Sequence, residues 1–187
     1  MTGFSGRAMR AMLDAYDLSG VATLADVGGG LGTNLTAALG RYPAMRGLLF
    51  DLPRVVERAR PRLEAAGVSG RCTVEGGDFF EAAPRGADAY LLGHIIHDWD
   101  DAKAGRILDN LRRAMPAGAK LLLAEYVLPE GDGASFGKLL DLHMMLLLGG
   151  LERTEAEYRR LFAAHGFRLT RVVPTAGDIS VVEGLPA

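Results

Sequence analysis

The sequence contains a single cysteine, Cys72, among 187 residues. An intrachain disulfide is therefore excluded, and one unpaired thiol is typical of a reducing compartment such as the cytoplasm. No apolar run approaches the roughly 18 residues needed to cross a membrane, and no basic-then-apolar signal segment opens the chain. Neither sign of charge dominates, because 21 basic and 23 acidic residues give a net charge of −2. This balance gives no indication of binding to nucleic acid or to an anionic membrane.

Two kinds of segment alternate along the sequence. Short apolar runs typical of buried strands are each followed by a longer stretch typical of a helix, and this unit occurs about five times. Two segments with alternating apolar residues then close the chain like an antiparallel strand pair. With 49% apolar residues in a chain of this length, residues 1–187 are predicted to form one α/β domain. Its sheet is expected to have seven mostly parallel strands, with helices on both faces.

The expected strands are Thr23–Val27, Leu48–Leu52, Arg71–Glu75, Ala89–Ile96, Lys120–Leu128, Arg168–Val173 and Ile179–Glu183. The expected helices are Leu31–Leu39, Arg54–Ala66, Ala102–Met115, Phe136–Leu148 and Glu155–His165. Ligands of such sheets bind beyond the carboxyl ends of the strands, near the switch in strand order. The segments that follow each strand are therefore the expected location of a site.

The first strand runs into a glycine-rich loop, Asp26-Val27-Gly28-Gly29-Gly30-Leu31-Gly32. Glycine lets the backbone turn sharply and approach a ligand closely. A dinucleotide fingerprint would place its last glycine at position 33, which is Thr33 here. The simplest interpretation is a flexible loop, but its acidic companions favour a binding loop for a nucleoside.

Two carboxylates follow the next two strands. Asp51 ends the second strand, where an acidic residue can bind two ribose hydroxyls. Asp78 follows the third strand and could accept a hydrogen bond from an exocyclic amine, while Phe79 packs on an adenine ring; the alternative for Asp78 is a simple turn residue. No lysine follows the glycine loop to bind a phosphate. These features predict a nucleoside site without a pyrophosphate cradle, and a cationic sulfonium nucleoside fits it.

The fourth strand runs into Gly93-His94-Ile95-Ile96-His97-Asp98-Trp99. His97 could be a general base, or it could only cap the next helix together with Asp98. His94 and His97 could suggest a metal pair, but two residues at this spacing on a strand end converge poorly, so no metal is predicted. Trp99 is interpreted as a packing anchor, and Asp100 or Asp101 as a helix N-cap.

The motifs together resemble the S-adenosylmethionine-dependent O-methyltransferases of the plant caffeate type and of bacterial polyketide tailoring. The matching segments are the glycine loop, Asp51-Leu52-Pro53, Gly77-Asp78-Phe79, His97-Asp98-Trp99 and Gly149-Gly150-Leu151-Glu152-Arg153-Thr154. The resemblance spans almost the whole chain and implies a Rossmann-like class I methyltransferase fold. It implies S-adenosylmethionine as the cofactor and S-adenosylhomocysteine as the product. It also implies cofactor contacts by Asp26, Gly28, Gly30, Asp51, Leu52, Asp78 and Phe79.

The resemblance also assigns the reaction and its residues. In that family the histidine of the His-Asp-Trp motif removes the proton from the acceptor hydroxyl, which makes His97 the general base. Glu125 and Glu152 stand where the family has glutamates flanking this histidine; without the resemblance they would be a strand-end residue and a charge at a helix start. The acceptor would be a small aromatic metabolite, such as a phenol or an aromatic polyketide. Its predicted contacts are Asp98, Met144 and Leu148, although Met144 could also be a core residue.

The ordinary pKa values constrain how His97 could act. A phenol with a pKa of about 10 and an imidazole with a pKa of about 6.5 differ by about 5 kcal/mol in proton affinity. Histidine therefore cannot fully deprotonate an ordinary phenol in advance. It must take the proton as the new C–O bond forms, or the acceptor must be unusually acidic.

The sequence departs from the family in two places. Gly93 stands where plant members have a lysine that contacts the cofactor. Family members also carry an N-terminal, mostly helical dimerisation domain to which nothing in these 187 residues corresponds. The apolar excess of the helix expected at 136–148 then predicts self-association or a separate partner chain.

Three other functions compete with O-methyl transfer. One is a relative that has become a decarboxylase or a hydroxylase. Another is a non-catalytic domain that needs a partner chain. The third is a Mg²⁺-dependent catechol-type enzyme, which the His-Asp-Trp motif disfavours because that motif belongs to the metal-free group.

Overall fold

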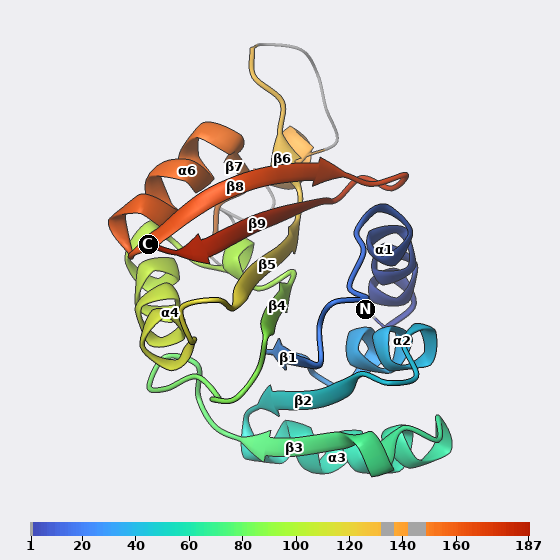
Figure 1. Cartoon of the computed structure of the whole chain (residues 1–187). Helices are drawn as coiled ribbons and strands as arrows, with labels where there is room; N and C mark the ends of the chain where they lie inside the picture. The colour runs from blue at the N-terminus through green and yellow to red at the C-terminus, as the bar shows by residue number, and fades with distance from the viewer. Residues whose placement is uncertain (1, 132–136, 142–148) are drawn as a thin grey trace.

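The computed structural model of the chain describes residues 2–131, 137–141 and 149–187. Its centre is a seven-stranded sheet with the strand order β3-β2-β1-β4-β5-β9-β8 (Figure 1). Neighbouring strands run parallel from β3 to β5. Strand β9 is antiparallel to both β5 and β8. The predicted architecture, a mostly parallel sheet with a C-terminal antiparallel pair, is confirmed.

The strands of this sheet are β1 Thr23–Val27, β2 Arg46–Asp51, β3 Cys72–Gly76, β4 Ala89–Gly93, β5 Lys120–Glu125, β8 Phe167–Pro174 and β9 Ser180–Pro186. A second, two-stranded parallel ladder joins β6 Val127–Leu128 to β7 Arg153–Thr154. The helices are α1 Thr2–Ala15, α2 Thr33–Arg41, α3 Pro53–Ala65, α4 Asp101–Ala114 and α6 Glu155–Ala164, with 3-10 turns η1 Ser69–Arg71 and η2 Ile96–Asp98.

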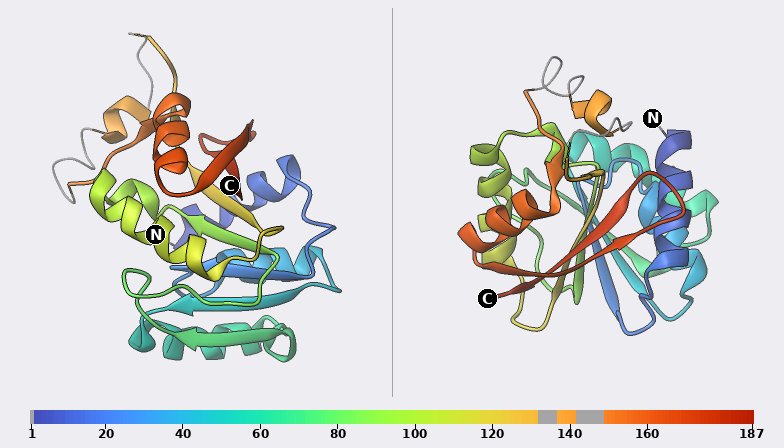
Figure 2. Two further views of the ribbon diagram at one scale, coloured as in Figure 1. Left: turned by 60° about the vertical axis from the view of Figure 1, so that its left-hand side comes forward. Right: turned by 90° about the horizontal axis from the view of Figure 1, so that it is seen from above.

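Helices cover both faces of the sheet (Figure 2), and each face has its own apolar core. Helices α1, α2 and α3 contribute to one core, and α4 and α6 contribute to the other. Strand side chains alternate between them: Leu91 joins the first core, whereas its neighbours Tyr90 and Leu92 join the second. A strand buried on both faces reads as a continuous apolar run, which explains the pattern of β4.

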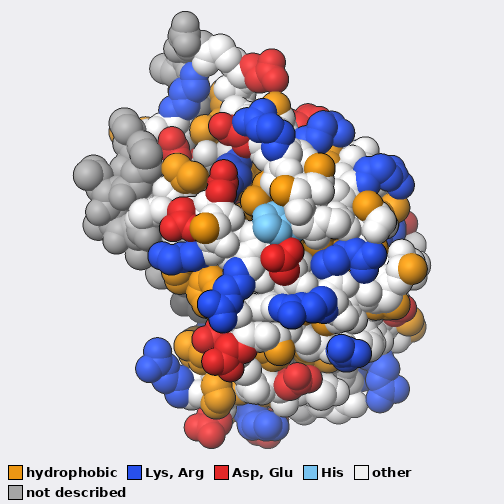
Figure 3. All heavy atoms as spheres, turned by 90° about the vertical axis from the view of Figure 1, so that its left-hand side faces the viewer, with side chains coloured by type: hydrophobic (Ala, Val, Ile, Leu, Met, Phe, Trp, Pro, Cys, Tyr) orange, Lys and Arg blue, Asp and Glu red, His pale blue; other side chains and the backbone are white. Residues whose placement is uncertain are grey.

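The surface over α4 and α6 carries basic side chains interrupted by acidic and uncharged ones (Figure 3). This mixed face agrees with the net charge of −2. Within residues 2–131, 137–141 and 149–187, no helix has both the length and the apolarity to cross a lipid bilayer.

Two strands are shorter than predicted, and both differences shape the site. The strand expected at Ala89–Ile96 ends at Gly93, because His94 adopts a left-handed backbone with φ 56°. An L-residue in that region cannot continue an extended strand. The strand expected at Lys120–Leu128 divides after Glu125, and Val127–Leu128 leaves the main sheet to pair with β7. Apolar residues resume directly after His94 and after Glu125, so the pattern alone could not show that the strands end there.

The predicted helices are observed with ends shifted by up to two residues, with one exception. The helix expected at 136–148 is described only over residues 137–141, which are helical. Met144 and Leu148, the two predicted acceptor contacts of this segment, lie outside the described residues. The predicted N-cap at Asp100 is confirmed, because Asp100 accepts a hydrogen bond from the Lys103 amide. Thr154 and Glu157 form a capping box at the start of α6.

Candidate active site

The glycine loop lies at the carboxyl end of β1, between β2 and β4, where the order of the parallel strands reverses. Gly28, Gly30 and Gly32 all have positive φ, between 59° and 76°, which a side chain would strain. A Cβ on Gly28 would also lie 2.6 Å from Cδ1 of Ile95. The loop therefore needs glycine both for its turn and for its close approach to the segment after β4.

Asp51 ties the end of β2 to this loop. Its Oδ2 accepts a hydrogen bond of 2.8 Å from the Gly30 amide, and its Oδ1 accepts one of 2.7 Å from the Leu52 amide. Each carboxylate oxygen has further lone pairs, so both can still accept hydrogen bonds from ribose hydroxyls. The prediction that Asp51 belongs to the nucleoside site is consistent with this position.

Asp51 opens onto a cavity of about 320 Å³, here named the Asp51 cavity. Its lining residues are Gly28, Asp51, Leu52, Gly77, Asp78, Phe79, Phe80, Ile95 and Trp99. The structure thus brings together all the residues predicted to bind the ribose and the base. Asp78 also accepts a hydrogen bond of 2.8 Å from the Phe80 amide through Oδ1, so it makes a turn and lines the cavity at once.

Three aromatic rings build one wall of the Asp51 cavity. The ring of Trp99 meets that of Phe80 edge-to-face at 4.8 Å between centroids, and Phe79 meets Phe80 at 4.9 Å. Such edge-to-face pairs hold rings rigidly. Trp99 is therefore a packing anchor, as predicted, and a lining residue as well. Phe80 and Ile95 were missed in the sequence, because nothing in an apolar side chain distinguishes a cavity wall from a core.

A second cavity of about 350 Å³, the His94 cavity, adjoins the first, and both share Gly28 and Ile95. Its lining residues are Gly28, Gly29, Gly30, Leu31, Thr33, Asn34, Gly93, His94, Ile95 and Asp98. A Cβ on Gly93 would lie 2.8 Å from Nδ2 of Asn34. The Asn34 amide thus occupies the space beside the position where the plant enzymes have lysine.

Asp26 lies beneath the glycine loop instead of in either cavity. It is fully buried, and a Cβ on Gly29 would lie 2.6 Å from its carboxylate. Burial raises the pKa of Asp26 to about 7, because a carboxylate loses its hydration there. This geometry does not favour the predicted direct contact of Asp26 with a cofactor and points to support of the loop.

His97 projects from η2 into a set of three carboxylates and is 8% exposed. Its Nδ1 lies 2.7 Å from Oε1 of Glu152 and 3.8 Å from Oε2 of Glu125. Its Nε2 lies 3.4 Å from Oδ1 of Asp98, which lines the His94 cavity. The structure thus brings together the three residues predicted to be catalytic, which come from three distant parts of the chain.

Glu125 holds the turn that carries His97. Its Oε1 accepts hydrogen bonds from the amides of Ile95 (3.0 Å) and Ile96 (2.9 Å). Burial raises the pKa of Glu125 to about 7, although the imidazolium of His97 opposes this shift. The side chain is a strand-end residue, as its position in β5 suggested, and also the electrostatic neighbour of His97.

Opposing effects set the basicity of His97. Burial disfavours the imidazolium, but the carboxylates of Glu125, Glu152 and Asp98 outweigh it and raise the pKa of His97 to about 9. His94 behaves in the opposite way: burial and the nearby charge of His97 lower the pKa of His94 to about 4. A neutral imidazole therefore lies next to a charged one, with 5.4 Å between ring centroids.

Potential metal-ligand atoms of His94, His97 and Glu125 lie within 4.8 Å of one another. Both amide hydrogen bonds to Glu125 fall on Oε1, and Nδ1 of His97 is 2.7 Å from Glu152. The His97–Glu152 contact is the arrangement expected of an imidazole oriented by a carboxylate. A metal-free site stays our prediction.

The fold and the two cavities define a class of protein. A glycine loop at the switch point, a carboxylate at the end of β2 and an aromatic wall suit an adenine nucleoside. Neither lining, in the part of the chain that the structure describes, includes a lysine or an arginine that would bind phosphate. The acidic groups suit a cationic ligand. These are the properties of a class I S-adenosylmethionine-dependent methyltransferase domain.

The chain belongs to the O-methyltransferase domain family, whose model matches residues 1–168. It is 51% identical over 184 residues to the phenazine O-methyltransferase PhzM of Lysobacter antibioticus, covering 98% of this chain and 54% of that protein. It is 42% identical over 170 residues to the mitomycin biosynthesis 6-O-methyltransferase of Streptomyces lavendulae, covering 90% of this chain and 48% of that protein.

A similar solved structure is that of the neocarzinostatin-biosynthesis O-methyltransferase NcsB1 with S-adenosylmethionine and 2-hydroxy-5-methyl naphthoic acid. It superimposes with a TM-score of 0.89 at 32% identity, covering 100% of this chain and 56% of that one. The chain thus spans about half the length of the relatives it matches. The family comparison supports S-adenosylmethionine as the cofactor.

Proposed function

We propose that this chain is the catalytic part of an enzyme that transfers a methyl group from S-adenosylmethionine to a hydroxyl of a small aromatic metabolite. The observation that carries the proposal is the contact of 2.7 Å between Nδ1 of His97 and Glu152, with Nε2 of the same ring 3.4 Å from Asp98, which lines the His94 cavity. Relatives named as methyltransferases support it and do not favour the decarboxylase or hydroxylase alternative.

Different residues of the chain would bind the cofactor and accept the proton. Bound S-adenosylmethionine would supply an electrophilic methyl group on sulfur and leave as S-adenosylhomocysteine. Asp51, Asp78 and Phe79 would hold its nucleoside, with Gly28 and Leu52 along the same cavity and Gly30 in the adjoining His94 cavity. Nε2 of His97 would take the acceptor's proton while Glu152, on Nδ1, fixes the tautomer and stabilises the imidazolium.

The raised pKa of His97 changes the energetics expected from its ordinary value. With a pKa of about 9, the proton affinity of the imidazole differs from that of a phenol by only about 1 unit, or about 1.4 kcal/mol. Proton transfer is then nearly balanced. The same shift leaves His97 mostly protonated at neutral pH in the ligand-free chain, so a cationic cofactor nearby would activate it by favouring loss of that proton.

Asp98 is proposed to contact the acceptor. Its carboxylate lines the His94 cavity and lies 3.4 Å from Nε2 of His97. An acceptor hydroxyl must approach that same nitrogen, so it would meet Asp98 there. Burial raises the pKa of Asp98, although His97 opposes the shift. Met144 and Leu148 stay predicted acceptor contacts.

The proposal is tested by incubating the chain with methyl-labelled S-adenosylmethionine and a panel of phenols, hydroxynaphthoates and aromatic polyketides. We expect a product that has gained one methyl group, with equimolar S-adenosylhomocysteine, by mass spectrometry. The reaction should be insensitive to a chelator, because the proposed mechanism uses no metal. A product that has lost carbon dioxide or gained oxygen would support the alternative chemistry instead.

We also propose that another chain covers the surface around residues 137–141, either a second copy or a partner that supplies the family's N-terminal domain. Leu139 is 65% exposed there, and Leu52 is the other large hydrophobic side chain exposed in the described ranges. Elution as a larger species, or methyl transfer that appears only when an N-terminal domain is added, is expected. Monomeric elution at micromolar concentration together with full activity would contradict this.

The single thiol, Cys72, favours the reducing cytoplasm as the place of reaction.

A further inference from the structure

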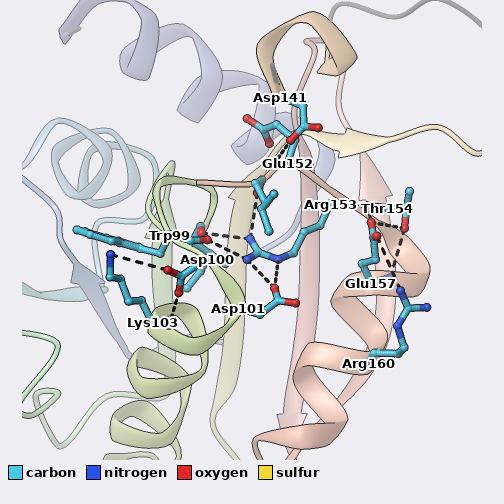
Figure 4. A network of polar contacts seen from close by, with 12 residues as sticks. Trp99, Asp100, Asp101, Lys103, Asp141, Glu152, Arg153, Thr154, Glu157 and Arg160 are labelled. Carbon is cyan, nitrogen blue, oxygen red and sulfur yellow. Dashed lines mark hydrogen bonds and ion pairs between the residues drawn. The ribbon is translucent and has the colours of Figure 1, made fainter. Parts of the chain in front are cut away.

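Arg153 is a charged residue in the interior, with only 3% of its side chain exposed. Its guanidinium donates through Nε and Nη2 to Oδ1 of Asp101, at 3.0 and 2.8 Å. Nη2 also donates to the carbonyl oxygen of Trp99 at 2.9 Å. Nη1 donates to the carbonyl oxygens of Ile96 at 3.2 Å and Leu151 at 3.0 Å. Figure 4 shows this guanidinium at the centre of a polar network between β7, η2 and the start of α4.

The acceptors of Arg153 lie on the two segments that carry the catalytic pair. Ile96 and Trp99 flank His97 in and after η2, and Leu151 immediately precedes Glu152. One side chain therefore contacts the backbone on both sides of the imidazole and the backbone next to its carboxylate partner. Arg153 itself lines neither the Asp51 cavity nor the His94 cavity.

One backbone hydrogen bond also joins these two segments, and another contact holds Glu152 to the helical residues 137–141. The Leu151 amide donates to the His97 carbonyl at 2.9 Å, and Asp141 accepts a hydrogen bond of 2.8 Å from the Glu152 amide. The Ile96 carbonyl oxygen also accepts a hydrogen bond of 3.2 Å from the Trp99 amide, so Nη1 of Arg153 is its second donor. Arg153 thus reinforces a turn that has few hydrogen bonds of its own. A planar guanidinium can satisfy several such acceptors at fixed angles, whereas an ammonium group cannot.

We propose that Arg153 is a positioning residue that sets the separation and alignment of the His97 imidazole and the Glu152 carboxylate. Its effect on catalysis rests on the proposed function, but its effect on the pair does not. The groups that face His97 are Glu125 from β5, Glu152 before β7, Asp98 from η2 and His94 after β4. Loosening the Arg153 network moves Glu152 relative to His97 while Glu125 keeps its own hydrogen bonds to the turn.

The first test measures the titration of His97 directly, without substrate. Imidazole resonances of the four histidines are followed by NMR in the full chain, and His97 is assigned with a His97→Gln variant. Loss of the Arg153 cation alone would raise the pKa of His97, so a fall of this pKa toward its ordinary value in Arg153→Met reports a loosened Glu152 contact, and this fall is the expected result. Arg153→Lys keeps the charge and is expected to lower the pKa of His97 less. Arg160→Met is the matched control, because Arg160 is 72% exposed and pairs with Glu157 at 3.8 Å, away from η2. It should leave the titration unchanged.

The second test measures turnover. Arg153→Met should lower kcat by about tenfold to a hundredfold with little change in the KM for cofactor, since misplacement of a catalytic group costs on that order. In a Glu152→Gln background the same substitution should have little further effect, because the partner that Arg153 positions has already been neutralised. A purely structural role would give the same loss in both backgrounds.

Each outcome decides one of the two proposals. A folded Arg153→Met variant in which His97 titrates as in the parent overturns the positioning role. A parent chain without methyl transfer, even with a partner domain, overturns the proposed function and leaves the NMR test valid. If Arg153→Met does not fold, Asp101→Ala replaces it: this change removes an acceptor that is 73% exposed and should shift the His97 titration in the same direction by a smaller amount.

Discussion

Replacement of His97 by glutamine is expected to lower kcat for methyl transfer by about 10²–10⁴-fold and to leave binding of the product S-adenosylhomocysteine, which lacks the sulfonium charge, unchanged. Glutamine keeps a polar side chain beside Glu152 but cannot accept the proton of an acceptor hydroxyl. The proposed nucleoside contacts Asp51, Asp78 and Phe79 line the Asp51 cavity, whose lining does not include His97. Single-turnover rates with labelled S-adenosylmethionine, together with calorimetric titration of S-adenosylhomocysteine, measure the two quantities separately.

Asp51→Asn is the control, because it should weaken cofactor binding and affect turnover much less. It should weaken S-adenosylhomocysteine binding by about tenfold or more, because the hydrogen bond of 2.8 Å to the Gly30 amide becomes a neutral one and the ribose hydroxyls lose a charged acceptor. Its rate at saturating cofactor should fall much less than that of His97→Gln. Equal turnover of His97→Gln and the parent would show that another base acts or that alignment alone drives the reaction.

The pH dependence of the parent follows from the charge of His97. Only the neutral imidazole can act as a base, so with a pKa raised to about 9 the rate should rise with pH below that value and level off above it. The effect on stability has the opposite sign. A raised folded-state pKa stabilises the fold fully below the unfolded value of about 6.5, and this contribution is lost as the pH rises through about 9. In His97→Gln, both dependences should flatten over this range.

Replacement of Gly150 by alanine is expected to destabilise the fold by about 1–3 kcal/mol and to lower kcat by about a hundredfold or more. A Cβ there would lie 2.1 Å from the His97 carbonyl oxygen and 2.7 Å from the Asp98 carbonyl carbon. Both neighbours are backbone atoms, so η2 and the segment leading to Glu152 must move apart. Denaturant unfolding and the His97 NMR titration measure the cost and the displacement.

Gly149→Ala is the matched control for that change. Gly149 has φ 68°, but a Cβ on it would meet no described atom within 4 Å. Alanine should therefore cost about 1–2 kcal/mol of backbone strain and leave the spacing of His97 and Glu152 intact. If Gly149→Ala and Gly150→Ala lost turnover equally, close approach at Gly150 would not be the cause.

Local patterns in the sequence predict the sheet and most of the site's members. The strands follow from apolar runs, and their carboxyl ends meet at one edge, so the order of the chain is enough to place Asp51, Asp78 and His97 together. The break after β4 could not be predicted, because Ile95 and Ile96 continue the apolar pattern beyond His94. The turn after His94 is held by Glu125, about 30 residues further along the chain, through hydrogen bonds from the Ile95 and Ile96 amides.

The buried residues that hold the site in place, Asp26 and Arg153, were harder to predict than the residues that line it. The position of Asp26 depends on how tightly the glycine loop folds over it, which its neighbours in sequence do not specify. Arg153 finds its acceptors about 50 residues away along the chain, at Ile96, Trp99 and Asp101. The only available signal was its place next to Glu152 in a motif shared with the family.

The pairing of β6 with β7 has a consequence for how such a chain could diversify. The chain leaves the main sheet at Val127, and Arg153 pairs with Val127 in the two-stranded ladder. The segment between them therefore begins and ends at the same ladder. Asp141 and residues 149–152 of this segment belong to the His97 site. We expect that the rest of it can be exchanged without moving β5 or α6, so that the cofactor side and the base stay constant while the predicted acceptor contacts change. A graft of this remainder between relatives, with those residues kept, would test whether it determines acceptor selectivity.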